Sequence, residues 1–145
     1  MATAAERGVT LMELLTALAI VGILSALAYP GFRGQLLRAH RTEAITGLLA
    51  LAAAQERHFM AHRVYATGLE GSQGGLPISS HTASGRYGLS VSGEAGGGYL
   101  ASATVLPNGP QAADRECATL TLDANGTRRA YSASGEDSTR ACWGR

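Results

Sequence analysis

Glu13 carries the strongest chemical constraint in this sequence of 145 residues. It is the only ionisable residue in an apolar run that extends from Leu11 to Tyr29. A carboxylate within such a run costs on the order of a few kcal/mol unless a partner charge or an interface accommodates it. The run therefore predicts one of two arrangements: an interfacial acid in the first turn of a helix, where the helix dipole favours it, or a carboxylate paired from outside this helix.

Other groupings of reactive side chains give weaker signals. His58 and His62 have the i,i+4 spacing of a helical zinc pair, but no third ligand accompanies them. Asp123 and Asn125 resemble the start of a calcium loop, but the later acidic ligands are missing and an ordinary turn accounts for them. The sequence contains no lysine, so none of its glycine runs fits a phosphate-binding loop. We predict no metal site, no cofactor and no enzymatic activity.

Three arginines near the C-terminus could form a small basic edge that contacts DNA. These residues are Arg128, Arg129 and Arg140. Glu136 and Asp137 share the same segment, and the formal net charge of the chain is only +1. The sequence therefore favours a solvated hairpin over a DNA site at these arginines.

A long helix is predicted to position Glu13. Nineteen apolar-rich positions span roughly 28 Å as a helix, close to the thickness of bilayer hydrocarbon, and predict a transmembrane segment at about 10–30. The helical pattern resumes after Pro30, with an apolar stripe on one face. One helix is thus expected within 9–63, from about Leu11 to about His62, with a kink near Pro30. The stripe residues are Ile45, Leu48, Leu49, Ala52 and Phe59.

Residues 64–145 are predicted to form a small antiparallel sheet of about four strands. Alternating segments begin at Tyr87, Tyr99, Cys117 and Thr127, and glycine-rich turns separate them. The stripe of the helix can cover the apolar face of this sheet, which gives an α+β fold. Cys117 and Cys142 enclose a loop that includes the polar tail. In an extracytoplasmic domain they are expected to form a disulfide, and two free buried thiols are the alternative.

The residues of the N-terminal segment resemble those of a type IV prepilin. The resemblance rests on Gly-Val-Thr-Leu-Met-Glu-Leu at 8–14, Ala-Ile-Val-Gly-Ile-Leu at 19–24 and Ala-Tyr-Pro at 28–30. Farther along, residues 38–56, the segment that starts at Cys117, and Cys142-Trp143 are similar to PilE-type minor pilins. The resemblance implies the type IV pilin fold, in which a long N-terminal helix packs on a small antiparallel sheet.

The resemblance also implies roles for single residues. A prepilin peptidase would cut between Gly8 and Val9 and so remove the leader, and Val9 would become an N-methylated terminus. Glu13 would pair with the Val9 amine of a neighbouring subunit during filament assembly. Gly22 and Pro30 match positions where pilin helices loosen on entering the filament.

At the level of the whole molecule, the resemblance implies a minor pilin that contributes to pilus assembly and to pilus-dependent motility or adhesion. Residues 1–8 would be a cytoplasmic leader, the helix would anchor the subunit in the inner membrane, and residues 64–145 would lie in the periplasm until assembly into an extracellular pilus. Expected partners are major and minor pilins, the prepilin peptidase, the assembly platform and membrane lipid.

Three alternatives remain. The first is a DNA-binding minor pilin for DNA uptake. The second is a pseudopilin of a type II secretion system, against which the cysteine pair and Trp143 argue. The third is a membrane protein that never polymerises, against which Glu13 and the leader motif argue.

Overall fold

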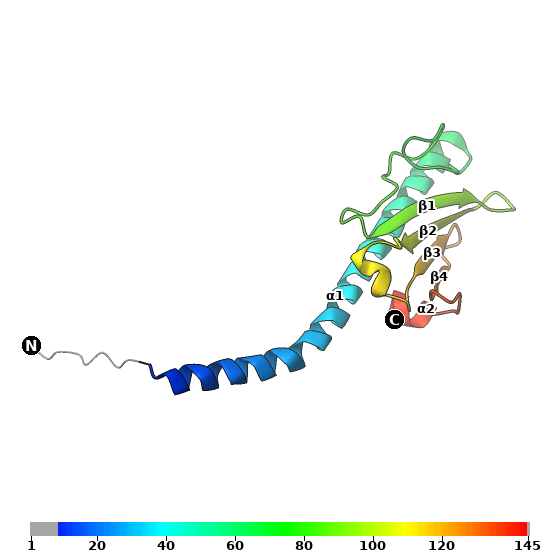
Figure 1. Cartoon of the computed structure of the whole chain (residues 1–145). Coiled ribbons are helices and arrows are strands. Elements are labelled where there is room, and N and C mark those ends of the chain that lie inside the picture. Colours follow the sequence, from blue (N-terminus) through cyan, green and yellow to red (C-terminus); the bar gives the residue numbers. More distant parts are fainter. Residues whose placement is uncertain (1–8, 145) are drawn as a thin grey trace, which may run out of the picture. The chain divides into compact units, whose positions relative to one another are not determined.

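A computed structural model describes the backbone of residues 9–144 and, within helix α1, every side chain except those of residues 28–31 and 33. Helix α1 spans Leu11–His62 without interruption (Figure 1). Thr10 precedes it, and its Oγ1 accepts a hydrogen bond from the Glu13 N–H at 3.3 Å. A threonine at this position, with a glutamate three residues later, is the sequence of a capping box. The first turn of α1 therefore has a local reason to begin at Leu11.

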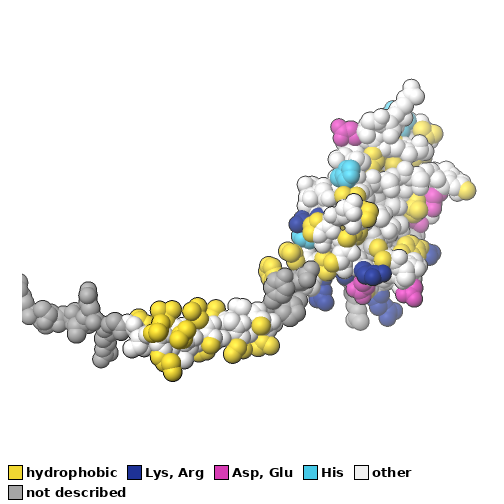
Figure 2. Space-filling model, viewed as in Figure 1, with side chains coloured by type: hydrophobic (Ala, Val, Ile, Leu, Met, Phe, Trp, Pro, Cys, Tyr) yellow, Lys and Arg dark blue, Asp and Glu magenta, His cyan; other side chains and the backbone are white. Residues whose placement is uncertain are grey.

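The first half of α1 exposes a continuous series of apolar side chains, which cover much of its visible face in Figure 2. Their exposed fractions lie between 52% and 78%. Among the described residues, no helix is long and apolar enough to cross a membrane, so the structure does not support the predicted segment at about 10–30. Residues 1–8, including Gly8, lie outside the described part of the chain. The exposed side chains are Val9, which precedes α1, and Leu11, Met12, Leu14, Leu15, Leu18, Ile20, Val21, Ile23, Leu24 and Leu27.

The structure divides into two compact units, Met1–Leu36 and Leu37–Arg145. The predicted boundary between the helix and the sheet domain, after residue 63, instead falls inside the second of these units. The difference arises because the second half of α1 supplies one wall of the core, so it is compact with the sheet and not with the first half of the helix.

The second unit contains a four-stranded antiparallel sheet in the order β1-β2-β3-β4 (Figure 1). Helix α2 lies next to β4, and the 3-10 helix η1 lies between β2 and β3. The predicted α+β class, with a long N-terminal helix packed on four antiparallel strands, is confirmed. The elements are β1 (Tyr87–Gly93), β2 (Tyr99–Val105), η1 (Pro110–Ala113), β3 (Thr119–Asp123), β4 (Arg128–Tyr131) and α2 (Thr139–Trp143).

The buried face of α1 is rotated relative to the predicted stripe. Leu48 is fully buried as predicted, but Leu49 is 45% exposed. The centre of the buried face is formed by Ala44, Leu48, Leu51 and Gln55, which follow a helical i, i+4, i+7, i+11 pattern. Hydropathy misplaced the stripe because a glutamine occupies one of its central positions. The burial of Gln55 is compatible with folding because both ends of its amide are hydrogen-bonded to Ala66.

Candidate functional site

The first candidate surface surrounds Glu13 in the first unit. Val9, Leu11 and Met12 are all more than 65% exposed, so the carboxylate lies on an apolar surface that is open to other molecules. Within the described residues, the Glu13 carboxylate makes no ion pair or hydrogen bond. Only the backbone of Glu13 bonds to side chains there: its N–H donates to Thr10 Oγ1 and its carbonyl accepts from Thr16 Oγ1. A carboxylate in an apolar setting is costly unless a partner charge accompanies it, and no described residue of this chain supplies that charge.

The predicted loosening positions are both helical in this structure. Gly22 and Pro30 fall inside α1, which has no break at either of them. A methyl group in place of the Gly22 hydrogen would meet nothing within 4 Å, so packing within the chain does not require glycine there.

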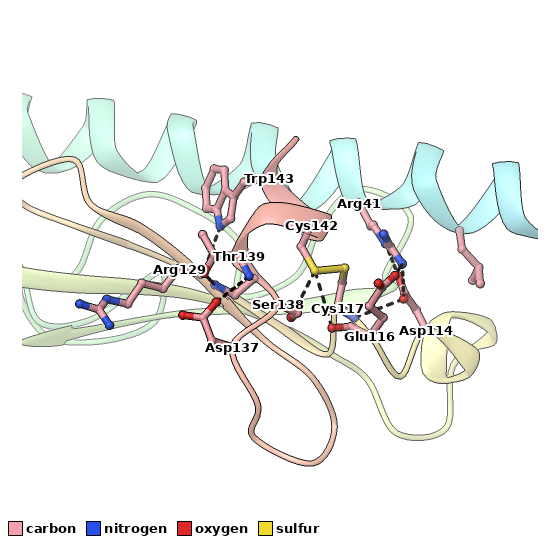
Figure 3. The surroundings of a disulfide bond; sticks show 12 residues. Arg41, Asp114, Glu116, Cys117, Arg129, Asp137, Ser138, Thr139, Cys142 and Trp143 are labelled. Atoms are coloured by element: carbon pink, nitrogen blue, oxygen red, sulfur yellow. Dashed lines mark hydrogen bonds and ion pairs between the residues drawn. A yellow bond between two sulfur atoms is a disulfide. The ribbon is translucent and has the colours of Figure 1, made fainter. Parts of the chain in front are cut away.

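A second candidate surface lies where α1 meets the loop between η1 and β3. Arg41 on α1 binds Asp114 through Nε to Oδ2 and Nη2 to Oδ1, each at 2.7 Å, and also reaches Glu116 at 3.1 Å (Figure 3). The buried Asp114 carboxylate also accepts hydrogen bonds from Gln111 Nε2 and the Cys117 N–H. The bond to Asp114 raises the pKa of Arg41 above its ordinary value, although burial opposes the rise.

Cys117 and Cys142 form a disulfide with a Cα–Cα distance of 5.7 Å. The bond ties α2 to the segment before β3 (Figure 3). Two further contacts join the same region to β4: Ser138 N–H donates to the Ala130 carbonyl at 2.9 Å, and Ala130 N–H donates to Thr139 Oγ1 at 2.9 Å. The C-terminal segment is thus bound to the sheet edge by both covalent and hydrogen bonds.

Arg128 and Arg129 lie on opposite faces of β4, as consecutive strand residues must. The Arg128 guanidinium stacks over the Trp143 ring, with its Cζ 5.3 Å from the ring centroid. Trp143 Nε1 donates to the Arg129 carbonyl at 2.8 Å, whereas the Arg129 side chain points away from the indole (Figure 3). The Arg129 side chain instead lines a hollow on the outer face of the sheet together with Asp123.

The three arginines that could have formed a single basic edge are therefore divided between two faces. Arg128 belongs to the α2 side of the domain with the exposed Arg140, whereas Arg129 lies on the other face beside carboxylates. Arg38 and Trp143 line one open pocket between α1 and α2. Arg38 and Arg128 thus adjoin the same indole, and the exposed Arg140 precedes Trp143 by three residues, about one turn, on α2. We call Arg38, Arg128, Arg140 and Trp143 the α2 surface.

The two histidines with zinc-pair spacing make local contacts. His58 Nδ1 contacts the Val64 carbonyl, His62 Nδ1 contacts the His58 carbonyl, and the two rings stack at 4.3 Å. No cluster of three or more metal-binding side chains occurs among the described residues.

Asp123 closes a turn through hydrogen bonds to its Oδ1 from the Asn125 and Thr127 N–H groups, each at 2.8 Å. Partial burial by itself would raise the pKa of the Asp123 carboxyl, but these hydrogen bonds lower it below its ordinary value.

Two residues of these sites were missed from the sequence. Asp114 is separated from Arg41 by 73 positions, so no local spacing connects them. Gln111 looked like an ordinary loop residue, yet it is fully buried beside Asp114. The one sequence feature that could have indicated the site is the position of Asp114, three residues before Cys117. Rules based on local patterns assign no role to an acid at that spacing.

Comparison with known families gives two matches. Residues 30–121, more than half of the chain, match the family described as "Type IV minor pilin ComP, DNA uptake sequence receptor". Residues 3–29 match the prokaryotic N-terminal methylation motif.

Individual relatives are also pilins. The chain is 38% identical over 102 residues to the type IV major pilin protein PilA of Myxococcus xanthus, covering 70% of this chain and 44% of the relative. It is 31% identical over 110 residues to a fimbrial protein of Moraxella nonliquefaciens, covering 76% of this chain and 60% of the relative. The chain therefore spans only about half the length of these relatives.

A solved type IV pilin from Shewanella oneidensis aligns with 63% of this chain and 89% of its own. The identity is 24% and the TM-score is 0.44, so this likeness is weak.

Proposed function

Because the chain belongs to the family of the type IV minor pilin ComP, we propose that it polymerises into a type IV pilus through the N-terminal half of α1. The prediction of a type IV pilin is confirmed by this family membership. The observation that carries the proposed assembly mechanism is the position of Glu13. It lies in the first turn of a helix whose apolar side chains are exposed, and its carboxylate has no partner among the described residues.

The proposed pairing explains how subunits could select one vertical offset. Apolar side chains pack on one another nearly as well one helical turn along, so they do not fix the offset alone. A charge pair between Glu13 and the Val9 amine of a neighbouring subunit would fix it, because every other offset leaves both charges unpaired in an apolar bundle. Gly22 and Pro30 would allow α1 to loosen during this step.

We propose that the subunit is processed before it assembles. The prepilin peptidase would cut at Gly8 and methylate Val9, while the apolar segment holds the subunit in the inner membrane with the second unit in the periplasm. The assembly platform would then transfer it to a filament of major and minor pilins outside the cell. The match to the N-terminal methylation motif over residues 3–29 supports this sequence of events.

The test compares the amounts of Glu13 variants in sheared pili and in membranes. Glu13→Ala and Glu13→Gln should remain in membranes but be lost from pili, and Glu13→Asp should be recovered in part because its reach is one methylene shorter. Glu70→Ala, at an exposed acid of the second unit, is the matched control and should enter pili normally. Recovery of Glu13→Ala in pili at the level of the unaltered protein would show that this carboxylate does not set the offset.

A second candidate function, DNA binding during uptake, is favoured by the α2 surface. The matching family is described as a DNA uptake sequence receptor. On the α2 surface, Arg128 and Arg140 are exposed and lie on the side of the domain that carries Trp143. Arginines with an adjacent aromatic ring suit contacts to phosphates and bases.

DNA binding by the purified protein should weaken steeply with salt, because each neutralised phosphate releases counterions. A combined Arg128→Ala and Arg140→Ala change should weaken binding and reduce the salt slope by about 2. Arg129→Ala is the matched control, since Arg129 adjoins Arg128 but faces the other way. Normal entry into pili without salt-dependent DNA binding would leave the filament role as the function.

A further inference from the structure

The outer face of the sheet, opposite the core, carries a hollow of about 340 Å³. Its floor is formed by Leu100 on β2 and Thr121 on β3. Glu94 comes from the β1–β2 turn, Asp123 stands at the end of β3, and Arg129 and Tyr131 come from β4. We call these six residues the outer-face hollow. The volume lies at the lower end of the roughly 300 to 1,000 Å³ that is typical of small-molecule sites.

The strand register explains why these side chains converge. Leu100 pairs with Asp123, Thr121 with Arg129, and Thr119 with Tyr131, so alternate residues of three strands share one face. Their strand neighbours Leu120, Leu122 and Ala130 are buried in the core on the other face.

Most polar groups of the outer-face hollow have no partner among the described residues. Neither Arg129 nor Glu94 forms an ion pair there, although the hollow brings both signs of charge together. Asp123 uses Oδ1 for its turn, and no hydrogen bond to its Oδ2 is found in the described part of the chain. The Arg129 backbone carbonyl accepts hydrogen bonds from Thr121 Oγ1 and Trp143 Nε1. These bonds do not use the guanidinium, which is therefore available to a ligand.

This set of groups discriminates among ligands by charge. A phosphate offers only acceptors and would meet two carboxylates, whereas a bare cation would meet a guanidinium. An apolar ligand would strip water from every polar group without replacing its hydrogen bonds. A hydroxyl both donates and accepts, so a ligand rich in hydroxyls can satisfy carboxylates, guanidinium, phenol and threonine together.

We propose that the outer-face hollow binds a short saccharide. Adjacent sugar hydroxyls would donate to Glu94 and Asp123, and sugar oxygens would accept from Arg129. The carbon–hydrogen face of the ring would pack on Leu100 and on the Tyr131 ring, whose hydroxyl remains free to hydrogen-bond. Two carboxylates and one guanidinium give the site a formal charge of −1, so amino sugars should bind more tightly than neutral sugars, and uronic acids most weakly.

The experiment measures the binding of the full-length protein to immobilised oligosaccharides. The protein is kept in a detergent without a sugar headgroup. The three probe classes are glucosamine, glucose and glucuronate oligomers of matched length. We expect the order glucosamine, glucose, glucuronate in apparent affinity. Binding to none of the three, or tightest binding to glucuronate, would overturn the proposal.

Variants connect any binding to the outer-face hollow. Glu94→Gln and Arg129→Ala should each weaken binding about tenfold, the effect of losing one charged hydrogen bond. Arg57→Ala and Glu70→Gln, which change the same residue types at exposed positions elsewhere, should bind as the unaltered protein does. Unchanged binding by both hollow variants would refute the site. Circular dichroism and thiol labelling of each variant show whether the fold and the disulfide are intact, so that misfolding is not mistaken for loss of the site.

Discussion

The guanidinium of Arg41 and the carboxylate of Asp114 form a two-point ion pair between helix α1 and the loop that follows η1. Both contacts measure 2.7 Å, and the Asp114 side chain is only 1% exposed. A bidentate pair fixes orientation as well as distance. Cys117 donates its N–H to the same carboxylate, so the pair also positions the disulfide relative to α1.

Removal of Arg41 should therefore destabilise the second unit. Arg41→Ala leaves the Asp114 carboxylate buried without its cation, which we expect to cost about 3–5 kcal/mol in the free energy of unfolding. Arg41→Lys keeps the charge but not the planar fork, so its loss should be intermediate. Urea unfolding followed by circular dichroism measures both variants. Arg57→Ala, an exposed arginine on the same helix, is the control, and equal stability of Arg57→Ala and Arg41→Ala would contradict the role of the pair.

We predict that the second unit loses stability at alkaline pH because of the buried hydroxyl of Tyr87. Burial raises the pKa of its hydroxyl to about 12, and the Asp114 carboxylate adds to the rise. Tyrosine in the unfolded chain ionises near pH 10. Between these values the folded protein keeps a proton that the unfolded chain has lost. The contribution of Tyr87 is thus complete below about pH 10 and declines by about 1.4 kcal/mol per pH unit toward about pH 12.

The measurement is the slope of unfolding free energy against pH across that window. Tyr87→Phe should make the slope shallower, while Tyr99, whose pKa burial also raises to about 12, keeps its own share. Tyr87→Phe also removes the hydrogen bond from Gln111 to the Tyr87 hydroxyl. That loss lowers the free energy of unfolding by the same amount at every pH, so it leaves the slope unaffected. Parallel curves for the two proteins would contradict the prediction.

The sequence predicted the fold well where local patterns decide it. Strand alternation and glycine-rich turns located all four strands, and Asn125-Gly126 marked the β3–β4 turn. Helix periodicity did less well in the second half of α1. It favoured Leu49 and overlooked Gln55, because a hydropathy count treats an amide as polar even where backbone groups satisfy it.

Gln55 should accordingly act as a core residue. Its Nε2 donates to the Ala66 carbonyl at 2.7 Å, and its Oε1 accepts the Ala66 N–H at 2.9 Å, so it fixes the chain reversal after α1. Gln55→Ala leaves both backbone groups buried without partners, and we expect a loss of about 2–5 kcal/mol. Gln55→Glu keeps the shape but loses the donor and buries a charge, so it should also destabilise. Denaturant unfolding tests both, with the exposed Ala53→Ser as the control.

The candidate sites were harder to predict than the fold, for a topological reason. Arg128 and Arg129 are adjacent in the sequence, which suggested that they could belong to one basic patch. Strand geometry places them on opposite faces. The partners that decide the setting of each arginine, Trp143 for Arg128 and Asp123 for Arg129, come from other elements. Spacing within one segment therefore cannot reveal such sites.

Removal of the disulfide should lower the free energy of unfolding moderately and loosen only the C-terminal segment. Cys117 and Cys142 are 25 positions apart, and in the chain-entropy model their link contributes about 3.5 kcal/mol. A combined Cys117→Ser and Cys142→Ser change should lower stability by about that amount and speed proteolysis of residues 132–143, while the circular dichroism signal of α1 persists. Labelling of both thiols in the untreated protein would contradict the bond itself.

The N-terminus offers the most direct check of processing. The match to the N-terminal methylation motif spans residues 3–29, and the proposed cleavage position, Gly8, lies within it. Helix α1 begins three residues beyond Gly8, so a cut there would leave the Val9 amine close to Glu13 in the first turn. A positive amine at that position adds to the local field that favours an acid near a helix start. Intact-mass analysis of protein extracted from membranes should give a chain that starts at Val9 with one added methyl group. Gly8→Asp, which places a charged side chain at the cleavage position, should give the uncut, unmethylated chain. A terminus near Ala28 in the unaltered protein would instead show ordinary secretion, in which the apolar segment is discarded and Glu13 has no part in assembly.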